Sequence, residues 1–149
     1  MRARVVLAFD FGLRRIGLAS GDTLTRTAAP LLTVAHHDAG PDWTAIDRSL
    51  RTLGPDLLVV GSPYNEDGSA GSMIAHADAF AQALRDRYGL EVQRVDERYS
   101  SLAATSLLRE QRASGQRRRA VKKGDVDSAA AAVLLASWLE QQMTSYGSE

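Results

Sequence analysis

The pattern of apolar and polar positions predicts an α/β domain that begins with a buried strand. Residues 5–9 read VVLAF, a continuous apolar run that is typical of a strand covered on both faces. The run stops at Asp10, Gly12 permits a tight turn, and residues 16–20 resume a mostly apolar, extended pattern. We therefore expect the first two strands to form a hairpin.

Three later segments, 28–35, 56–61 and 90–96, also predict strands. Pro30 favours an edge or entry position for the first of them, and DLLVVG in the second is a buried type of strand. The third alternates apolar and polar residues. The expected sheet has five strands, of which the first three are antiparallel and the last two parallel.

Helical periodicity predicts helices over 42–53, 69–88, 102–108 and 125–143. The last of these is apolar nearly all round, so we expect it to be largely buried. Residues 36–41 are expected to form a loop and residues 144–149 a loose tail. The order of elements favours a mixed sheet with helices on both faces.

Composition limits the classes of protein to which this chain can belong. Its 149 residues are most economically one domain, 1–149, and 44% hydrophobic and 24% charged residues are ordinary for a globular protein. The absence of Cys excludes disulfides and thiolate metal sites. No run approaches the ~20 apolar residues that span a bilayer, so we expect a cytoplasmic protein with no membrane partner.

Carboxylates stand at three predicted element ends: at Asp10, at Asp96-Glu97 and at Asp125-Val126-Asp127. In α/β domains ligands gather outside the carboxyl ends of parallel strands, so Asp10, Glu97 and Asp127 are expected to converge. Three carboxylates repel one another unless a divalent cation neutralises them, and Mg²⁺ and Mn²⁺ prefer such oxygen ligands. We expect one or two of these ions.

Each acid also has a simpler interpretation. Asp10 and Gly12 fit ordinary hairpin-turn chemistry, and Asp96-Glu97-Arg98 fits a solvated turn. Asp125 is a good N-cap. Because Asp125 and Asp127 are two residues apart, they cannot share one helix face, so we expect Asp125 to cap the helix and Asp127 to point into the site.

A basic segment precedes the last helix. Segments of this kind bind phosphate backbones through counterion release, although a solubilising loop is the competing interpretation. Cations near the predicted acids, Arg14, Arg15 and Arg98, are expected to add phosphate contacts. The cations of the basic segment are Arg112, Arg117, Arg118, Arg119, Lys122 and Lys123.

Other kinds of site are disfavoured. The chain has no GxxxxGK[ST], GxGxxG or GxSxG motif, which removes the P-loop, dinucleotide and serine-hydrolase interpretations. His36, His37 and His76 have no spacing that indicates a zinc site.

Four ordered motifs resemble the YqgF-type family of pre-16S rRNA nucleases and Holliday-junction-resolvase-like proteins, over about residues 5–141. They are AFDFGLRRIGLA at 8–19, VGSPYNEDGS at 60–69, VDERYSS at 95–101 and GDVDSAAAAVLL at 124–135. The resemblance implies an RNase H-like fold and makes Asp10, Glu97 and Asp127 its three metal-binding acids. Leu13, Ser62 and Asp125 depart from the family pattern without touching these acids.

Three functions follow from these observations. The first is a divalent-metal-dependent nuclease acting on structured nucleic acid, either precursor 16S rRNA or branched DNA as for a Holliday-junction resolvase. The second is a nucleic-acid-binding protein of the same fold without catalysis. The third, an actin- or sugar-kinase-like ATPase, would need a second domain with a second Asp-x-Gly hairpin, which the chain does not show. A monomer and a homodimer both remain open.

Overall fold

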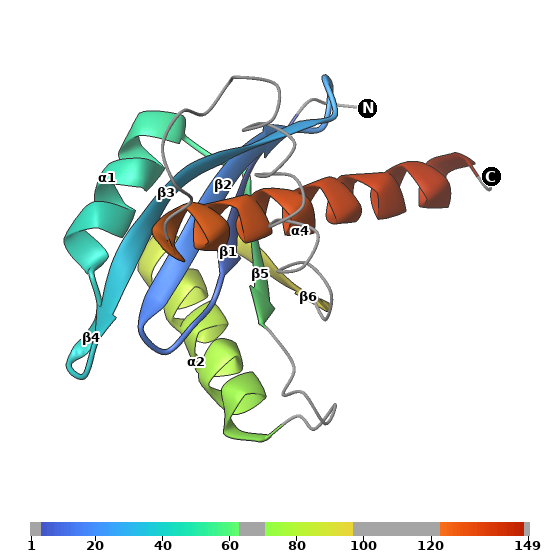
Figure 1. Cartoon of the computed structure of the whole chain (residues 1–149). Coiled ribbons are helices and arrows are strands. Elements are labelled where there is room, and N and C mark those ends of the chain that lie inside the picture. The colour runs from blue at the N-terminus through green and yellow to red at the C-terminus, as the bar shows by residue number, and fades with distance from the viewer. Residues whose placement is uncertain (1–3, 63–70, 97–122, 148–149) are drawn as a thin grey trace.

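The computed structural model describes residues 4–62, 71–96 and 123–147 (Figure 1). The predicted helix at 102–108 and the basic residues 112–122 lie outside this part of the chain. Its strands are β1 (Val5–Asp10), β2 (Arg15–Asp22), β3 (Thr27–His37), β4 (Gly40–Pro41), β5 (Leu57–Ser62) and β6 (Glu91–Asp96). Its helices are α1 (Trp43–Leu53), α2 (Gly71–Tyr88) and α4 (Lys123–Gly147).

The strands form one mixed sheet in the order β4-β3-β2-β1-β5-β6. β1, β2 and β3 are antiparallel neighbours, whereas β5 is parallel to β1 and β6 is parallel to β5. This confirms three antiparallel strands followed by two parallel ones. The carboxyl ends of β1, β5 and β6 therefore lie at one edge of the sheet.

The prediction of five strands was wrong, because the structure has a sixth. β3 continues to His37, beyond the predicted end at 35, and His36 and His37 pair with Pro41 and Gly40 of β4. Gly40 has a φ of +126°, which glycine adopts at little cost, so the chain can reverse there. The residues expected to form a loop at 36–41 thus add a short edge strand.

One face of the sheet packs against α1 and α2 through large side chains. Phe80 of α2 lies 5.5 Å from Phe9, 5.2 Å from Phe11 and 5.8 Å from Trp43 of α1, measured between ring centroids. Ile16 and Leu18 of β2 are fully buried in the same cluster. Aromatic packing of this kind adds to the stabilisation from buried area.

The opposite face is covered by α4, which crosses it as a single long helix (Figure 1). The β2 residues on this face are small: Gly17, Ala19 and Gly21 alternate with Ile16 and Leu18 on the other face. A Cβ atom on Gly21 would lie 2.5 Å from the Thr27 carbonyl oxygen and 2.8 Å from Leu135 Cδ2. The missing side chains let α4 approach the sheet closely.

The ends of α4 differ from those predicted. The helix begins at Lys123, so Asp125 lies inside its first turn and is not the N-cap. A carboxylate in the first turn is favoured by the helix dipole in any case, so Asp125 satisfies the charge preference there without capping. The helix also includes residues 144–147 of the predicted tail, because no Gly or Pro interrupts it between Asp125 and Gly147.

A polar cluster joins α1 to α2 at their outer surface. The Arg87 guanidinium donates from Nε and Nη2 to the two carboxylate oxygens of Asp47, at 2.8 and 2.7 Å, and the Tyr88 hydroxyl donates to Asp47 at 2.6 Å. These hydrogen bonds hold the pKa of Asp47 well below its usual range, and the bond from Arg87 contributes most. Burial, together with the bond to Asp47, raises the pKa of Tyr88.

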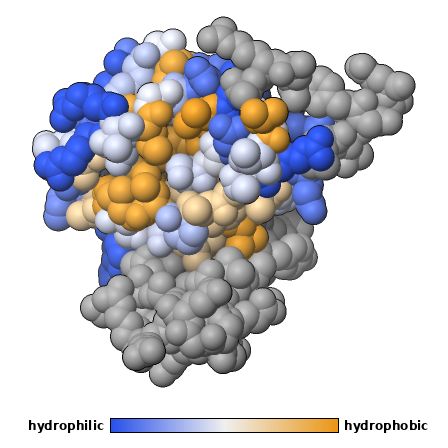
Figure 2. Space-filling model, turned by 90° about the horizontal axis from the view of Figure 1, so that it is seen from above, coloured by the Kyte–Doolittle hydropathy of each residue, from blue (hydrophilic) through white to orange (hydrophobic). Residues whose placement is uncertain are grey.

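The described surface carries few large apolar side chains, and they belong to separate segments: Leu13, Leu24 and Leu31 are 49%, 72% and 39% exposed. Figure 2 shows hydrophobic patches interspersed with hydrophilic residues on the face viewed from above. None of the described helices is long and apolar enough to cross a membrane.

Candidate metal and nucleic-acid site

Asp10 ends β1 and faces the α4 side of the sheet. Alternation along β1 places Val6 and Ala8 in the cluster under α4, and Asp10 continues that face. Its neighbours are Gly17 on β2 and Gly61 on β5, neither of which has a side chain. Neither of the residues aligned with Asp10 therefore adds a side chain beside its carboxylate.

Asp127 is brought to the same place by the contact between α4 and β2. A Cβ atom on Gly17 would collide with the backbone carbonyl of Asp127 and would lie 2.9 Å from the Ser128 nitrogen. Gly17 is paired directly opposite Asp10. Residues paired in this way across antiparallel strands are on the same face of the sheet. Asp10 and Asp127 therefore lie on one face, with Gly17 between their backbones. The convergence of their carboxylates at one metal site stays a prediction.

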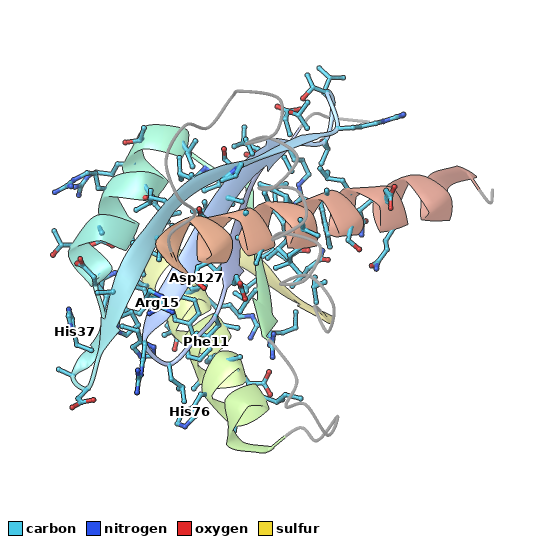
Figure 3. The ribbon with its side chains drawn as sticks, in the orientation of Figure 1. Phe11, Arg15, His37, His76 and Asp127 are labelled. Atoms are coloured by element: carbon cyan, nitrogen blue, oxygen red, sulfur yellow. The ribbon has the colours of Figure 1, made fainter. Side chains whose placement is uncertain are left out.

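Arg15 forms an ion pair with Asp127, the acid that α4 contributes. Its Nε donates to Asp127 Oδ2 at 2.6 Å, and the two side chains are 40% and 26% exposed. Figure 3 shows Arg15 and Asp127 next to each other below the first turns of α4. The bond is a charge-assisted hydrogen bond between residues 112 positions apart.

The third predicted acid, Glu97, lies outside the described residues, as does Arg98. The strand that leads to it is in register with the site: Asp10 is aligned with Gly61, and Gly61 with Val95. Val95 packs on the α4 side of the sheet. In the part of the chain that is described, no three His, Asp or Glu side chains form a group that could hold a metal ion.

The turn between β1 and β2 is held by His36 of β3. The His36 ring Nδ1 donates to the Gly12 carbonyl oxygen at 2.8 Å, since a carbonyl only accepts. The backbone N–H of His36 donates to the Arg14 carbonyl at 2.9 Å, and its ring meets Phe11 edge-on at 5.3 Å. His36 thus fixes the turn beside Asp10, a role that its position in a predicted loop did not reveal.

Gly12 serves the turn, as its position in the predicted hairpin indicates. A Cβ atom there would lie 2.6 Å from the Arg15 carbonyl oxygen. Gly12 is needed because the turn's own backbone fills that space.

The remaining predicted cations are only partly described. The side chain of Arg14 is on the surface of the turn, beside Leu13, which is also exposed. Lys123 is the first residue of α4 and not part of a loop. The other basic residues, Arg112, Arg117, Arg118, Arg119 and Lys122, fall outside the described ranges, and so do Asn65, Asp67 and Gly68.

The described residues fit a hard divalent cation at this edge of the sheet. The donors are carboxylate oxygens from a strand end and a helix, which Mg²⁺ and Mn²⁺ prefer. Arg15 bonds one oxygen of Asp127 through Nε, which leaves the other carboxylate oxygen outside that bond. Asp10 and Asp127 are therefore the residues that would hold such an ion.

Sequence comparison relates nearly the whole chain to known proteins. A family model described as "RuvX: Holliday junction resolvase" matches residues 4–141. A protein of Edwardsiella ictaluri named "Putative pre-16S rRNA nuclease" is 44% identical over 142 residues, which cover 95% of this chain and 99% of that one. A protein of Escherichia coli O7:K1 with the same name is 45% identical over 136 residues, or 91% and 96% of the two chains.

Structural comparison identifies the fold. T. thermophilus RuvC in complex with a Holliday junction substrate matches with a TM-score of 0.57 at 16% identity, over 94% of this chain and 96% of that one. The fowlpox virus Holliday junction resolvase matches with a TM-score of 0.52 at 14% identity, over 93% and 99%. At these identities the likeness shows the fold alone, and it confirms the RNase H-like architecture.

Proposed function

Because the chain belongs to the RuvX family, we propose that it is a divalent-metal-dependent nuclease that cleaves phosphodiester bonds in structured nucleic acid. Its substrate would be precursor 16S rRNA, as the names of the relatives at 44% and 45% identity suggest. Branched DNA of the Holliday-junction type is the second candidate substrate, because of the family description and the fold.

The observation that carries this proposal is the placement of two carboxylates on one face across Gly17. Asp10 comes from the end of β1, and Asp127 comes from α4, which approaches β2 so closely that a Cβ on Gly17 would meet the Asp127 backbone. Carboxylates that lie close together repel one another, and a bound divalent cation would relieve that repulsion. Glu97 is proposed as the third ligand.

One or two Mg²⁺ or Mn²⁺ ions bound there would lower the pKa of an attacking water and stabilise charge on the leaving oxygen. The protein's own contribution is to position them. β1 and α4 fix the carboxylates through backbone contacts, and His36 fixes the turn that carries Arg14 and Arg15. The guanidinium groups of Arg14 and Arg15 would contact the phosphate backbone of the substrate beside the acids.

The basic residues that precede α4 would contact the rest of the nucleic acid without reading its sequence, together with Arg98. They are Arg112, Arg117, Arg118, Arg119, Lys122 and Lys123. Binding of this kind weakens as salt rises. An rRNA substrate would place the protein in the cytoplasm. It would act there as a monomer or as a homodimer.

The test is cleavage of a precursor 16S rRNA fragment and of a four-way DNA junction in the presence of Mn²⁺. We expect Asp10→Asn and Asp127→Asn to reduce the rate of the preferred substrate roughly 100-fold or more, because each removes a ligand charge that the metal needs. Asp38→Asn is the matched control, because Asp38 is exposed in the turn between β3 and β4. Equal rates in the wild type and all three variants would contradict the nuclease site.

The alternative is a nucleic-acid-binding protein of the same fold. It is favoured if the wild type cleaves neither substrate, yet binds both in a salt-sensitive manner that Asp10→Asn does not change.

A further inference from the structure

Arg15 is placed to contact either of two anions. Its backbone is fixed in β2, opposite Ala35 of β3, while its guanidinium donates to Asp127 Oδ2 at 2.6 Å. Its side chain is nevertheless 40% exposed, and the guanidinium has donors beyond the Nε that binds Asp127.

A cation on Asp127 opposes the binding of a second cation. The Arg15 bond withdraws one carboxylate oxygen, and its positive charge repels a divalent ion that approaches the same group. Arg15 and the metal of the proposed site therefore compete for Asp127. Because the pair is only partly buried, the ion pair is weak enough to exchange partners.

A phosphodiester offers the guanidinium a different acceptor. Arg binds phosphate oxygens with two parallel N–H bonds, whereas only its Nε bond to Asp127 is seen here. When a phosphate binds the Arg15 guanidinium, Asp127 becomes available as a ligand of the metal. The two ligands then assist each other, and thermodynamic linkage requires the assistance to be equal in both directions.

We propose that Arg15 couples metal binding to nucleic-acid binding, by holding Asp127 when nucleic acid is absent and releasing it to the metal when a phosphate of the substrate binds the guanidinium. The inference rests on the proposed function, since it needs the metal site at Asp10 and Asp127. It adds that the free protein binds its metal weakly and the complex binds it tightly.

The experiment measures the Kd of Mn²⁺ by electron paramagnetic resonance, with the full chain alone and with an RNA hairpin whose phosphorothioate linkages slow cleavage. For the wild type we expect the hairpin to tighten Mn²⁺ binding about fivefold or more. Arg15→Gln should bind Mn²⁺ several-fold more tightly than the wild type without RNA, and the hairpin should then add little. The Gln amide can still donate to Asp127, so this variant keeps a tie between β2 and α4, and thermal unfolding checks its fold.

Arg48→Gln is the matched control, because it removes the same charge from an exposed arginine of α1, on the opposite face of the sheet from Asp127. It should keep the wild-type Mn²⁺ affinity and the wild-type tightening. If Arg15→Gln keeps both values, or if Arg48→Gln changes them equally, the coupling role of Arg15 is overturned while the metal site stands. If the wild type binds no Mn²⁺ with or without RNA, the proposed metal site itself fails, and the coupling fails with it.

Discussion

The two faces of the sheet are built in opposite ways. The α1–α2 face is filled by large side chains, with Phe80 in contact with three other aromatic rings. The α4 face has glycine at two of the β2 positions, and the helix lies against strand backbone. The first arrangement tolerates small shifts because side chains can adjust, whereas the second fixes the distance between backbones.

This difference explains where the candidate site lies. Asp10 is on the α4 face, and Asp127 is in α4 itself, so the spacing of the two acids depends on backbone contact and not on the fit of side chains. The aromatic face supports the fold without touching these acids. The two faces should therefore respond differently to substitution.

Phe80→Ala should have the largest effect on stability. It removes a ring that is 4% exposed and should lower the free energy of unfolding by about 3–5 kcal/mol, measured by urea denaturation. The folded fraction should keep its Mn²⁺ affinity, since the ring is on the face away from the acids. A weakened Mn²⁺ affinity in folded Phe80→Ala would show that the two faces are not independent.

Gly17→Ala should have a smaller effect on stability and a larger one on the site. The added methyl group must displace the Asp127 backbone, which costs about 1–3 kcal/mol and moves the carboxylate away from Asp10. We expect Mn²⁺ binding, measured by electron paramagnetic resonance, to weaken at least tenfold.

Gly21→Ala is the matched control for Gly17→Ala. It also forces a methyl group between β2 and α4, but beside Leu135 and the Thr27 carbonyl, away from the acids. It should destabilise the protein comparably and leave Mn²⁺ affinity near that of the wild type. Equal Mn²⁺ affinities in the two variants would show that Gly17 does not set the spacing of Asp10 and Asp127.

Trp138→Phe tests the side-chain hydrogen bond that joins Trp138 of α4 to Gln93 of β6. The indole Nε1–H donates to Gln93 Oε1 at 2.9 Å, and its loss should cost about 1 kcal/mol. A double-mutant cycle with Gln93→Leu, read by urea denaturation, should give a coupling energy of similar size. A coupling energy near zero would mean that packing of the ring alone holds this end of α4.

Asp47→Asn should have the smallest effect and a distinctive dependence on pH. The folded-state pKa of Asp47 is lowered by Arg87 and Tyr88, so its stabilising contribution is fully present above the ordinary aspartate pKa of about 4 and is lost progressively as the pH falls from there through the lowered folded-state pKa. The Arg87 side chain is 43% exposed, so solvent screening limits the contribution.

We expect the Tm of Asp47→Asn to be a few degrees below the wild-type Tm at pH 7, and the difference to be smaller at pH 3 and to close only at still lower pH, where Asp47 is protonated in the folded protein. Asp38→Asn, an exposed aspartate outside the cluster, should show no such convergence. A difference that stayed constant between pH 7 and pH 3 would contradict the lowered pKa.

Local pattern predicted most of the fold because each element carries its own signal. The apolar run before Asp10, the alternation at 90–96 and the helical period at 42–53 are read directly from neighbouring residues. Asp42 accepts from the Ala45 N–H at 3.2 Å, and Gly54 closes the helix with a φ of +57°. β4 was not predicted because two residues are too few to show the alternation of apolar and polar positions that marks a strand.

The site was predictable only in part, because its decisive contacts join distant residues. Asp10 and Asp127 stand at element ends, which sequence patterns can locate. The need for glycine at position 17 arises only when α4 lies on β2, and nothing near Gly17 in the sequence indicates it. The Arg15–Asp127 pair and the His36 contact with the turn are likewise tertiary, so no spacing predicts them.

The 112 positions between Arg15 and Asp127 also order events during synthesis. The ribosome releases all six strands before it has made α4, since translation proceeds from β1 to the C-terminal helix. A nascent or truncated chain that ends before Lys123 therefore carries Asp10 without its partner acid. Such a fragment is expected not to cleave the nucleic acid around it until the last helix docks.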